Sequence, residues 1–216
     1  MLAEQALSPS ARLKSVAGIQ RVPTPKVELF IVRGFADADS CGAFIERIDR
    51  KRRPSTIADD IGVANYRTSE TCDLDSGDPL VAALDRRICE LMGLLREFGE
   101  PIQGQRYAPG QEFRAHTDTF EPGGMDYLTH CGIAGQRTWT AMLYLNEPEE
   151  GGATRFKAIG KTIRPETGKL LAWNNLGPDG RPNPATMHQG MKVRRGTKYV
   201  LTKWFRERPW PRPTAN

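Results

Sequence analysis

The chain has 216 residues, 38% of them hydrophobic and 26% charged, a composition typical of a soluble globular protein with a core of its own. The formal net charge is +5, but the basic residues form only short clusters, at 50–53 and 194–195, so we expect no nucleic-acid partner. No apolar run could cross a bilayer and the N-terminus lacks a basic start with an apolar stretch, so we expect no membrane span, no signal peptide and a cytoplasmic location.

The first predicted elements follow a polar N-terminal extension, residues 1–25, which contains three prolines. The run 27–35 is rich in β-branched and aromatic residues and closes around a glycine, which predicts a strand. Asp37 or Asp39 can then cap a helix whose apolar residues follow helical spacing and which ends before Pro54.

The clearest element in the chain is a helix over about 78–98. Asp78-Pro79 supplies a capping carboxylate followed by a first-turn proline. Seven apolar residues then recur with helical spacing: Leu80, Val81, Leu84, Ile88, Leu91, Met92 and Leu95. We expect this helix to support a sheet and to carry no chemistry. Two of the four cysteines fall in the two helical patterns, so most are expected to be small core residues.

After Gly99 the sequence changes to short strand-like runs separated by glycine and proline. The runs are 102–108, 112–118, 138–146, 154–158, 161–164, 168–174, 186–194 and 197–206. Short strands after two helices predict an α+β, mainly β fold, a sandwich or barrel with helices packed on one side. We expect one domain over 26–216, with helical support at about 37–98 and a β core at about 100–208.

The candidate metal ligands are histidines and one aspartate. In an extended segment, residues two apart project to the same side, so His116 and Asp118 can address one point in space. His188 would add a second imidazole, giving the two-histidine, one-carboxylate set of non-haem Fe(II) oxygenases, with coordination positions left open. His130 and Cys131 lie together in a glycine-rich loop, where nothing supplies the closed four-ligand set of a structural zinc site.

The second informative residue is a lysine in the last predicted strand. Alternation places Lys198 with Val200, Thr202 and Trp204 on one face of that strand, and Lys203 on the other. If the first face points inward, the buried ammonium needs an anion, and a bound dicarboxylate would supply one. If the sheet is turned over, Lys198 is exposed, and the alternation alone leaves both orientations open.

Four motifs follow one another along the second half of the chain. They are Gln105-Arg-Tyr107-x-x-Gly110-x-x-Phe113-x-x-His116-x-Asp118, Arg137-Thr-Trp-Thr-Ala-Met-Leu-Tyr-Leu-Asn146, Gly151-Gly-Ala-Thr154-Arg-Phe156 and His188-x9-Lys198-x5-Trp204. Their order and spacing resemble the prolyl 4-hydroxylase branch of the Fe(II)- and 2-oxoglutarate-dependent oxygenases. Upstream, Arg67-Thr-Ser69 and the helix at 78–98 are similar to that family's N-terminal region, so the likeness spans about 27–208.

This resemblance implies a double-stranded β-helix (jelly-roll) core in which His116, Asp118 and His188 bind Fe(II). It also implies that Lys198 pairs with the distal carboxylate of 2-oxoglutarate, with Tyr107 as a hydrogen-bonding helper. Fe(II) is then the metal, 2-oxoglutarate and O2 are co-substrates, and ascorbate is the reductant.

The resemblance further assigns residues around the metal. Thr154 and Trp204 match positions near the co-substrate pocket, and Arg137 matches a position that contacts substrate, although a strand-edge surface charge is the alternative. Phe113 stands where relatives that hydroxylate peptidyl proline often carry tyrosine, so the chain lacks one phenol hydrogen bond near the substrate. The glycine-rich loop 119–136 borders the expected entrance and is a candidate lid.

The implied activity is hydroxylation of peptidyl proline in a protein or proline-containing peptide, with release of succinate and CO2. The alternatives are the same chemistry on another residue or a small molecule, and a jelly-roll module that holds a metal without turnover. A ligand set with open positions, together with Lys198, argues against the binding module. A nucleic-acid demethylase is less favoured, because no base-stacking or phosphate-binding stripe is present in the sequence.

Overall fold

The computed structural model describes residues 7–55 and 66–211, and the expectations for 1–6, 56–65 and 212–216 lie outside these ranges. The described helices are α1 (Pro9–Ser15), α2 (Ala38–Lys51), α3 (Pro79–Met92) and α4 (Met125–Ala134), with short 3-10 helices η1 (Arg96–Phe98), η2 (Lys157–Ile159) and η3 (Pro184–Thr186). The described strands are β1 (Gln20–Arg21), β2 (Leu29–Val32), β3 (Arg53–Pro54), β4 (Glu70–Asp73), β5 (Gln103–Tyr107), β6 (Phe113–His116), β7 (Arg137–Tyr144), β8 (Glu150–Gly151), β9 (Thr154–Phe156), β10 (Lys161–Ile163), β11 (Leu170–Asn174), β12 (His188–Gly190), β13 (Val193–Arg195) and β14 (Lys198–Arg206).

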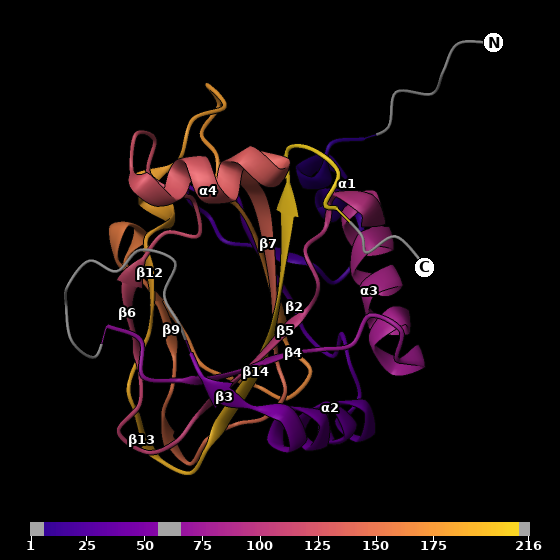
Figure 1. Ribbon diagram of the computed structural model, residues 1–216, viewed down its shortest axis with the longest axis vertical. Helices are drawn as coiled ribbons and strands as arrows, with labels where there is room; N and C mark the ends of the chain where they lie inside the picture. The colour runs from indigo at the N-terminus through magenta and orange to yellow at the C-terminus, as the bar shows by residue number, and fades with distance from the viewer. Residues whose placement is uncertain (1–6, 56–65, 212–216) are drawn as a thin grey trace.

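Two antiparallel sheets face each other across the interior. The major sheet has eight strands in the order β1-β2-β11-β7-β14-β5-β4-β3, and the minor sheet has four in the order β10-β9-β12-β6. Helix α4 lies across one end of the two sheets, and the β13–β8 pair lies toward the opposite end (Figure 1). The prediction of a mainly β, jelly-roll fold with supporting helices is confirmed.

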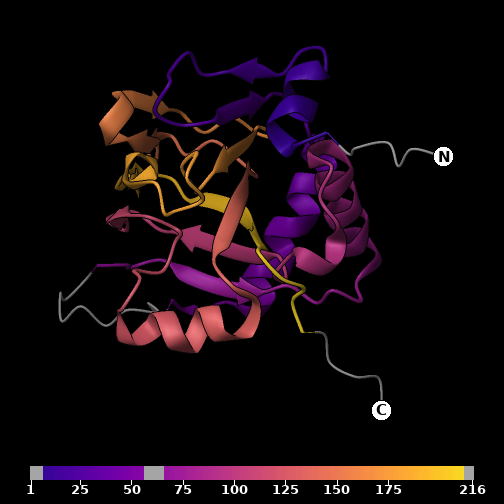
Figure 2. The ribbon, with the colours of Figure 1, turned by 90° about the horizontal axis from the view of Figure 1, so that it is seen from above.

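The major sheet is buried on both faces. Helices α1, α2 and α3 are grouped on its outer side (Figure 2), where Phe30 of β2 packs into the same cluster as Phe44 and Ile88. Leu29 and Ile31, the neighbours of Phe30, join the second cluster between the two sheets. Because side chains alternate along a strand, burial of both faces requires a continuous apolar run, which is what β2 presents.

The cap of α3 matches the prediction, but its end does not. Asp78 accepts a hydrogen bond from the backbone N–H of Leu80 at 2.8 Å, and proline follows at the first helical position. Gly93 adopts a left-handed conformation with φ of 66° and ends α3 there. The observed helix therefore ends at Met92, before the predicted end at about residue 98, and η1 follows it as a separate 3-10 turn.

Two further stretches differ from the expected elements. The segment 119–136, expected as a loop, contains α4, whose signal in the sequence is weak because its N-cap residue, Gly124, has no side chain to cap the helix. The expected strand 186–194 is divided into β12 and β13, with an irregular register between His188 and Gly190.

The described part of the N-terminal stretch packs against the rest of the domain. Leu13 of α1 is fully buried in the cluster under the helices. Strand β1 pairs with β2 and forms the edge of the major sheet. Residues 7–25 therefore contribute to the core.

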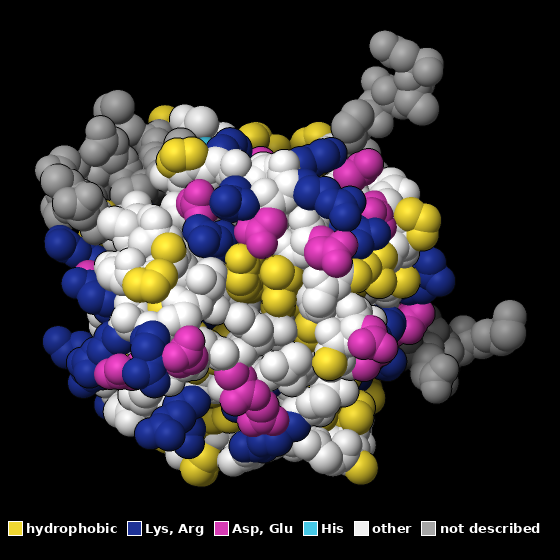
Figure 3. All heavy atoms as spheres, turned by 90° about the horizontal axis from the view of Figure 1, so that it is seen from below, with side chains coloured by type: hydrophobic (Ala, Val, Ile, Leu, Met, Phe, Trp, Pro, Cys, Tyr) yellow, Lys and Arg dark blue, Asp and Glu magenta, His cyan; other side chains and the backbone are white. Residues whose placement is uncertain are grey.

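Charged side chains of both signs cover the end of the molecule away from α4, where Lys and Arg alternate with Asp and Glu (Figure 3). At the β13–β8 pair, Arg194 and Arg195 form exposed ion pairs with Glu150 and Glu149 at 3.2 and 2.6 Å. The positive net charge is thus not gathered into one patch on this face. None of the helices in the described ranges is long and apolar enough to cross a bilayer.

One close backbone contact joins the turn after β2 to the start of β11. The carbonyl oxygen of Gly168 accepts hydrogen bonds from the backbone N–H groups of Phe35 and Ala36 at 2.8 and 3.3 Å. Gly168 has φ of +73°, and a Cβ at this position would lie 1.9 Å from the carbonyl oxygen of Ala36. Only glycine fits this approach without a shift of the backbone.

We expect Gly168→Ala to lower the free energy of unfolding by about 2–5 kcal/mol, because left-handed strain and a backbone clash add together. Gly160→Ala is the matched control, since Gly160 has φ of +62° but open space around its Cβ. Its expected loss is about 1 kcal/mol. Urea unfolding measures both changes, and equal losses would show that the close approach is not the cause.

Candidate metal centre

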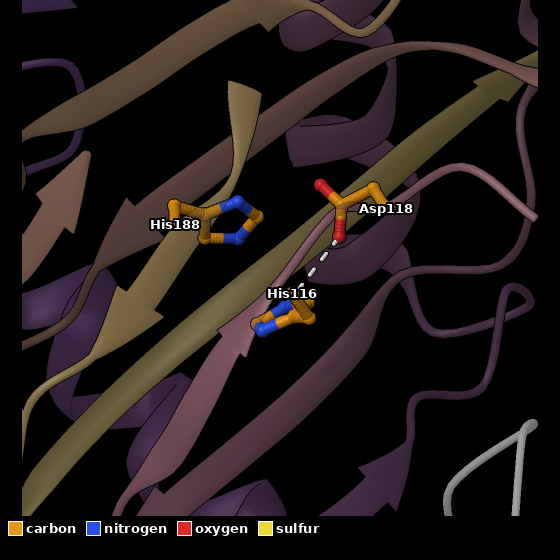
Figure 4. A group of neighbouring side chains, drawn as sticks. All are labelled: His116, Asp118 and His188. Atoms are coloured by element: carbon orange, nitrogen blue, oxygen red, sulfur yellow. Dashed lines mark ion pairs between the residues drawn. The ribbon is translucent and has the colours of Figure 1, made fainter. Parts of the chain in front are cut away.

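Three potential ligands converge between the sheets. His116 ends β6, Asp118 follows it, and His188 begins β12, directly opposite His116 in the register of the pair. One nitrogen or oxygen atom of each lies within 4.8 Å of the others, and the three side chains point toward a common centre (Figure 4). The Nε2 atom of His116 lies 3.9 Å from Oδ1 of Asp118.

Backbone carbonyls determine which nitrogen of each imidazole faces the centre. The Nδ1 atom of His116 lies 2.8 Å from the carbonyl oxygen of Arg114, and Nδ1 of His188 lies 3.1 Å from that of Thr186. A carbonyl oxygen can only accept, so each Nδ1 carries the proton and each Nε2 keeps a lone pair. This second hydrogen bond is the usual way in which a metal-binding histidine is oriented.

The electrostatics hold His116 and Asp118 in their metal-binding forms. Burial lowers the pKa of His116 to about 3, and the neighbouring His188 acts in the same direction. Burial alone would raise the pKa of Asp118, but His188, His116, Arg137 and the hydrogen bond from Thr140 hold it below its usual value. Neutral imidazoles and an ionised carboxylate are the states that bind a divalent metal.

Aromatic rings hold the two imidazoles in place. Phe113 stacks on His116 with ring centroids 3.6 Å apart, and the guanidinium of Arg67 lies 4.8 Å from the Phe113 centroid. Trp173 meets His188 edge-on at 4.9 Å. Phe113, predicted as a substrate contact, thus forms the wall of the centre beside His116.

The last strand turns its Lys198 face inward. Lys198, Val200, Thr202 and Trp204 line an inner cavity of about 50 Å³ together with His116, Asp118 and His188. On the other face of β14, Lys203 forms a buried ion pair with Asp85 at 2.7 Å. The sheet orientation that the sequence left open is therefore the inward one.

The ammonium of Lys198 lies in an unusual environment. It is 2% exposed, and in the described part of the chain it has neither a hydrogen bond nor an ion pair. Its Nζ lies 5.0 Å from the ring centroid of Tyr107 and 5.4 Å from that of Tyr144. Burial lowers the pKa of Lys198 to about 7.

Other polar groups of this cavity are donors as well. Tyr144 donates to Thr154 at 2.6 Å, which places the Thr154 hydroxyl beside the lysine region of the cavity. The buried indole N–H groups of Trp173 and Trp204 have no acceptor among the described residues. A ligand whose oxygen atoms only accept, such as the dianion of a keto acid, fits this set of donors.

A wider groove of about 770 Å³ leads outward from the centre. Besides His116 and Asp118, its walls include aromatic and apolar side chains: Tyr66, Phe113, Phe120, Met187, Trp204 and Trp210. Arg137 lies in this groove, with its guanidinium 3.9 Å from the ring centroid of Trp204. Arg137 is thus placed at the groove, and its side chain is not an exposed strand-edge charge.

Glu100 holds that groove wall through two arginines. Arg137 binds its carboxylate with two hydrogen bonds of 2.7 and 2.9 Å, and Arg206 adds a third of 3.0 Å. Burial would raise the pKa of Glu100, but Arg137 and Arg206 hold it below its usual value. No sequence motif marks Glu100 and Arg206, which meet only in the folded chain.

The hydrogen-bond partners of Asp118 were not predicted from the sequence either. Thr140 donates to Oδ2 of Asp118 at 2.7 Å, and Asn175 donates to Thr140 at 2.8 Å. A signal for Thr140 was present, because alternation along β7 places it on the same face as Met142 and Tyr144, which line the interior. His130, by contrast, lies away from the three ligands, in α4, where it stacks on Phe120 at 4.9 Å.

Comparisons with known proteins agree with this site. A profile of the 2OG-Fe(II) oxygenase superfamily matches residues 102–206. Prolyl 4-hydroxylase 13 of Arabidopsis thaliana is 27% identical over 202 residues, which cover 84% of this chain and 72% of the relative. Probable prolyl 4-hydroxylase 9 of the same plant is 30% identical over 197 residues, which cover 80% of this chain and 66% of the relative.

A solved structure shows the same fold. The viral collagen prolyl hydroxylase vCPH of Paramecium Bursaria Chlorella virus-1, in its 2OG complex, has a TM-score of 0.66 and 24% identity over 82% of this chain and 95% of that chain. The fold and the ligand set together define a double-stranded β-helix oxygenase. The superfamily profile, the prolyl 4-hydroxylase relatives and the ligand set together support a prolyl 4-hydroxylase-like 2-oxoglutarate oxygenase, a class of dioxygenase that uses Fe(II), 2-oxoglutarate and O2.

We expect Glu100→Gln to destabilise the fold by about 3–5 kcal/mol, because it leaves two buried guanidinium groups without a counter-charge. Glu121→Gln is the matched control in the same groove: Glu121 is exposed, and the expected change is within about 0.5 kcal/mol. Urea unfolding at neutral pH measures both. A Glu100→Gln variant as stable as Glu121→Gln would contradict the role given to this carboxylate.

Proposed function

We propose that the protein hydroxylates peptidyl proline in a protein or proline-containing peptide, with 2-oxoglutarate converted to succinate and CO2. The observation that carries this proposal is the buried ammonium of Lys198, which has no anionic partner in the described chain and shares one cavity with His116, Asp118 and His188. A module that only holds a metal has no need of such a cation. A dicarboxylic co-substrate that reaches from the metal to the lysine accounts for both features.

The three ligands would hold Fe(II) on one face and leave the remaining positions to the co-substrate and O2. When bound, the iron supplies the activation of O2 that is coupled to decarboxylation of the keto acid. The chain's own contribution is to bind, to orient and to exclude water. The neutral imidazole of His116 and the ionised carboxylate of Asp118 are ready to bind without releasing a proton, and His188 would add its Nε2 atom.

Lys198 would pair with the distal carboxylate of 2-oxoglutarate. Tyr107 and Thr154 are proposed to complete that end of the cavity, since both are buried and line it. Trp204 is proposed as a further contact, because its indole N–H lacks a protein acceptor in the described chain. These contacts fix the keto acid end relative to the metal, which is the positioning that such a reaction requires.

The outer groove would take the substrate. Its aromatic walls suit an extended proline-containing segment, which aromatic-lined grooves recognise in its polyproline conformation. Arg137 is proposed to bind a backbone carbonyl of that segment, and its contacts with Glu100 and Trp204 at the groove support this role. Proline is proposed as the target because the relatives are named prolyl 4-hydroxylases.

We further propose that residues 26–216 act as one oxygenase domain, against which the stretch 7–25 packs as part of the same core, and that the reaction takes place in the reducing cytoplasm. Four buried cysteines without disulfides support that compartment. Ascorbate is the proposed reductant that keeps the iron in its ferrous state.

The direct test is an incubation with Fe(II), 2-oxoglutarate and ascorbate against a panel of proline-containing peptides. We expect succinate release together with one added oxygen on a proline, read by peptide mass, and neither from the His116→Ala protein. Succinate without a modified peptide would support the same chemistry on another residue or a small molecule. A protein that binds iron and releases no succinate would overturn the dioxygenase proposal.

Removal of a ligand should abolish metal binding. We expect Asp118→Ala and His188→Ala each to weaken Co(II) or Mn(II) binding by more than about 100-fold, since even partners of metal ligands are worth ~10–100-fold. His130→Ala is the matched control, because this histidine stacks on Phe120 and lies outside the trio. Calorimetric titration in the absence of O2 gives the affinities, and a normal affinity in either ligand variant contradicts the assignment.

Binding of 2-oxoglutarate should weaken as the pH rises. The pKa of Lys198 in the empty site is about 7, and the charged form binds a carboxylate, so pairing raises this pKa in the complex. The dissociation constant should therefore rise by up to about tenfold per pH unit above neutrality. Lys198→Arg stays charged throughout and should show a flat profile over the same range. Equal slopes in the two proteins would exclude Lys198 as the titrating group.

A further inference from the structure

Two fully buried polar side chains lie behind the carboxylate of Asp118. Thr140, in the middle of β7, and Asn175, just after β11, are both 0% exposed. The Thr140 hydroxyl donates to Oδ2 of Asp118 at 2.7 Å, and Nδ2 of Asn175 donates to that hydroxyl at 2.8 Å. The three groups form a short chain of hydrogen bonds that ends on one oxygen of the carboxylate.

The direction of this chain follows from the proton inventory. A hydroxyl has one proton, and an ionised carboxylate can only accept, so the Thr140 proton goes to Asp118. The amide of Asn175 must then present its nitrogen to Thr140, because an amide oxygen there would meet a second acceptor. This arrangement occupies Oδ2 and leaves Oδ1, the atom nearer to His116, for a metal.

The same hydrogen bonds connect the two sheets. His116 and His188 belong to the minor sheet, whereas Thr140 pairs with Trp173 and Trp204 in the middle of the major sheet. The backbone of Asn175 is fixed in turn by hydrogen bonds to Thr138 at 2.8 Å and from Asn183 at 2.9 Å. Asp118 is therefore held to the sheet that also carries Lys198.

Packing alone does not explain Asn175. Its Oδ1 atom is buried and has no hydrogen-bond partner among the described residues. An unpaired buried carbonyl destabilises a fold by about 1–3 kcal/mol, so an apolar side chain would serve a purely structural purpose better. The side chain of Asn175 acts through its amide nitrogen, which donates to the Thr140 hydroxyl.

We propose that Thr140 and Asn175 are positioning residues that make Asp118 a one-oxygen ligand and hold the metal in register with the Lys198 anchor. The proposal rests on the proposed function, because it takes His116, Asp118 and His188 as the metal site. Without the Thr140 hydroxyl, Oδ2 would be free to turn toward the metal or away from it. Metal affinity and coordination geometry would then change together.

The test uses Co(II) as the probe, with its affinity from calorimetry and its geometry from the visible absorption spectrum. Thr140→Val keeps the shape of the side chain and removes the hydroxyl, and we expect Co(II) to bind about 10–100-fold more weakly with an altered spectrum. Thr140→Ser restores the hydroxyl and should return both readouts toward those of the unaltered protein. Asn175→Leu, which leaves Thr140 without its donor, should fall between them.

Thr138→Val is the matched control, because this hydroxyl of the same strand, β7, donates to the backbone carbonyl of Phe205 at 3.2 Å and does not line the inner cavity. It should lose stability without a change in Co(II) affinity. Urea unfolding of every variant separates a loss of fold from a loss of site, and the Ser and Leu variants decide the matter if Thr140→Val does not fold. Normal Co(II) affinity and spectrum in folded Thr140→Val overturn the inference. If Thr140→Val does not fold, the inference is overturned when folded Asn175→Leu binds Co(II) normally and Thr140→Ser does not restore the affinity and spectrum. Failure of the unaltered protein to bind Co(II) overturns the proposed function itself.

Discussion

The pairing of β6 with β12 is the constraint on which the site depends. It places His116 directly opposite His188, so that two imidazoles far apart in the sequence meet with ring centroids 4.3 Å apart. A slip of one residue in this register would turn one ring to the outside of the sheet and leave the other without a partner. Strand β9 fixes the register from the other side, because His188 is also opposite Phe156.

The site is divided between two sheets that must be held at the right separation. The minor sheet provides the imidazoles, and the major sheet provides Lys198 and, through Thr140, the orientation of Asp118. Sheets that pack face to face lie about 10 Å apart. An extended five-carbon dicarboxylate can span most of that distance, with one end at Lys198 on the major sheet and the other at a metal held by the minor sheet. The apolar cluster between the sheets therefore sets the distance between the metal and the co-substrate anchor.

Burial makes the charges of this region effective. The interior holds the ammonium of Lys198 and the carboxylate of Asp118 without pairing them to each other, so a divalent metal beside Asp118 and a dianion beside Lys198 would give each charge an opposite partner. The groove outside follows the same principle, since Glu100 lies between Arg137 and Arg206 and keeps one arginine stacked over Trp204. The charges of the groove wall are thus paired within the protein, whereas those of the inner cavity are left for a metal and an anionic ligand to pair.

The sequence by itself determined the elements whose signals are local. Alternation put His116 and Asp118 on one side of a strand, spacing put Lys198 and Trp204 on one face, and a capping carboxylate with a first-turn proline began α3 at its observed position. The ordered motifs also identified the family.

Only the tertiary structure decided which face of β14 points inward, because a period of two says that residues share a side but not which side is buried. It also decided the contacts of Glu100 and the hydrogen bonds from Thr140 and Asn175 to Asp118, since these join segments far apart in the chain and leave no periodic trace. Helix α4 and the stop at Gly93 depended on weak local signals, namely an uncapped helix start and one left-handed glycine, which only the surrounding packing makes decisive.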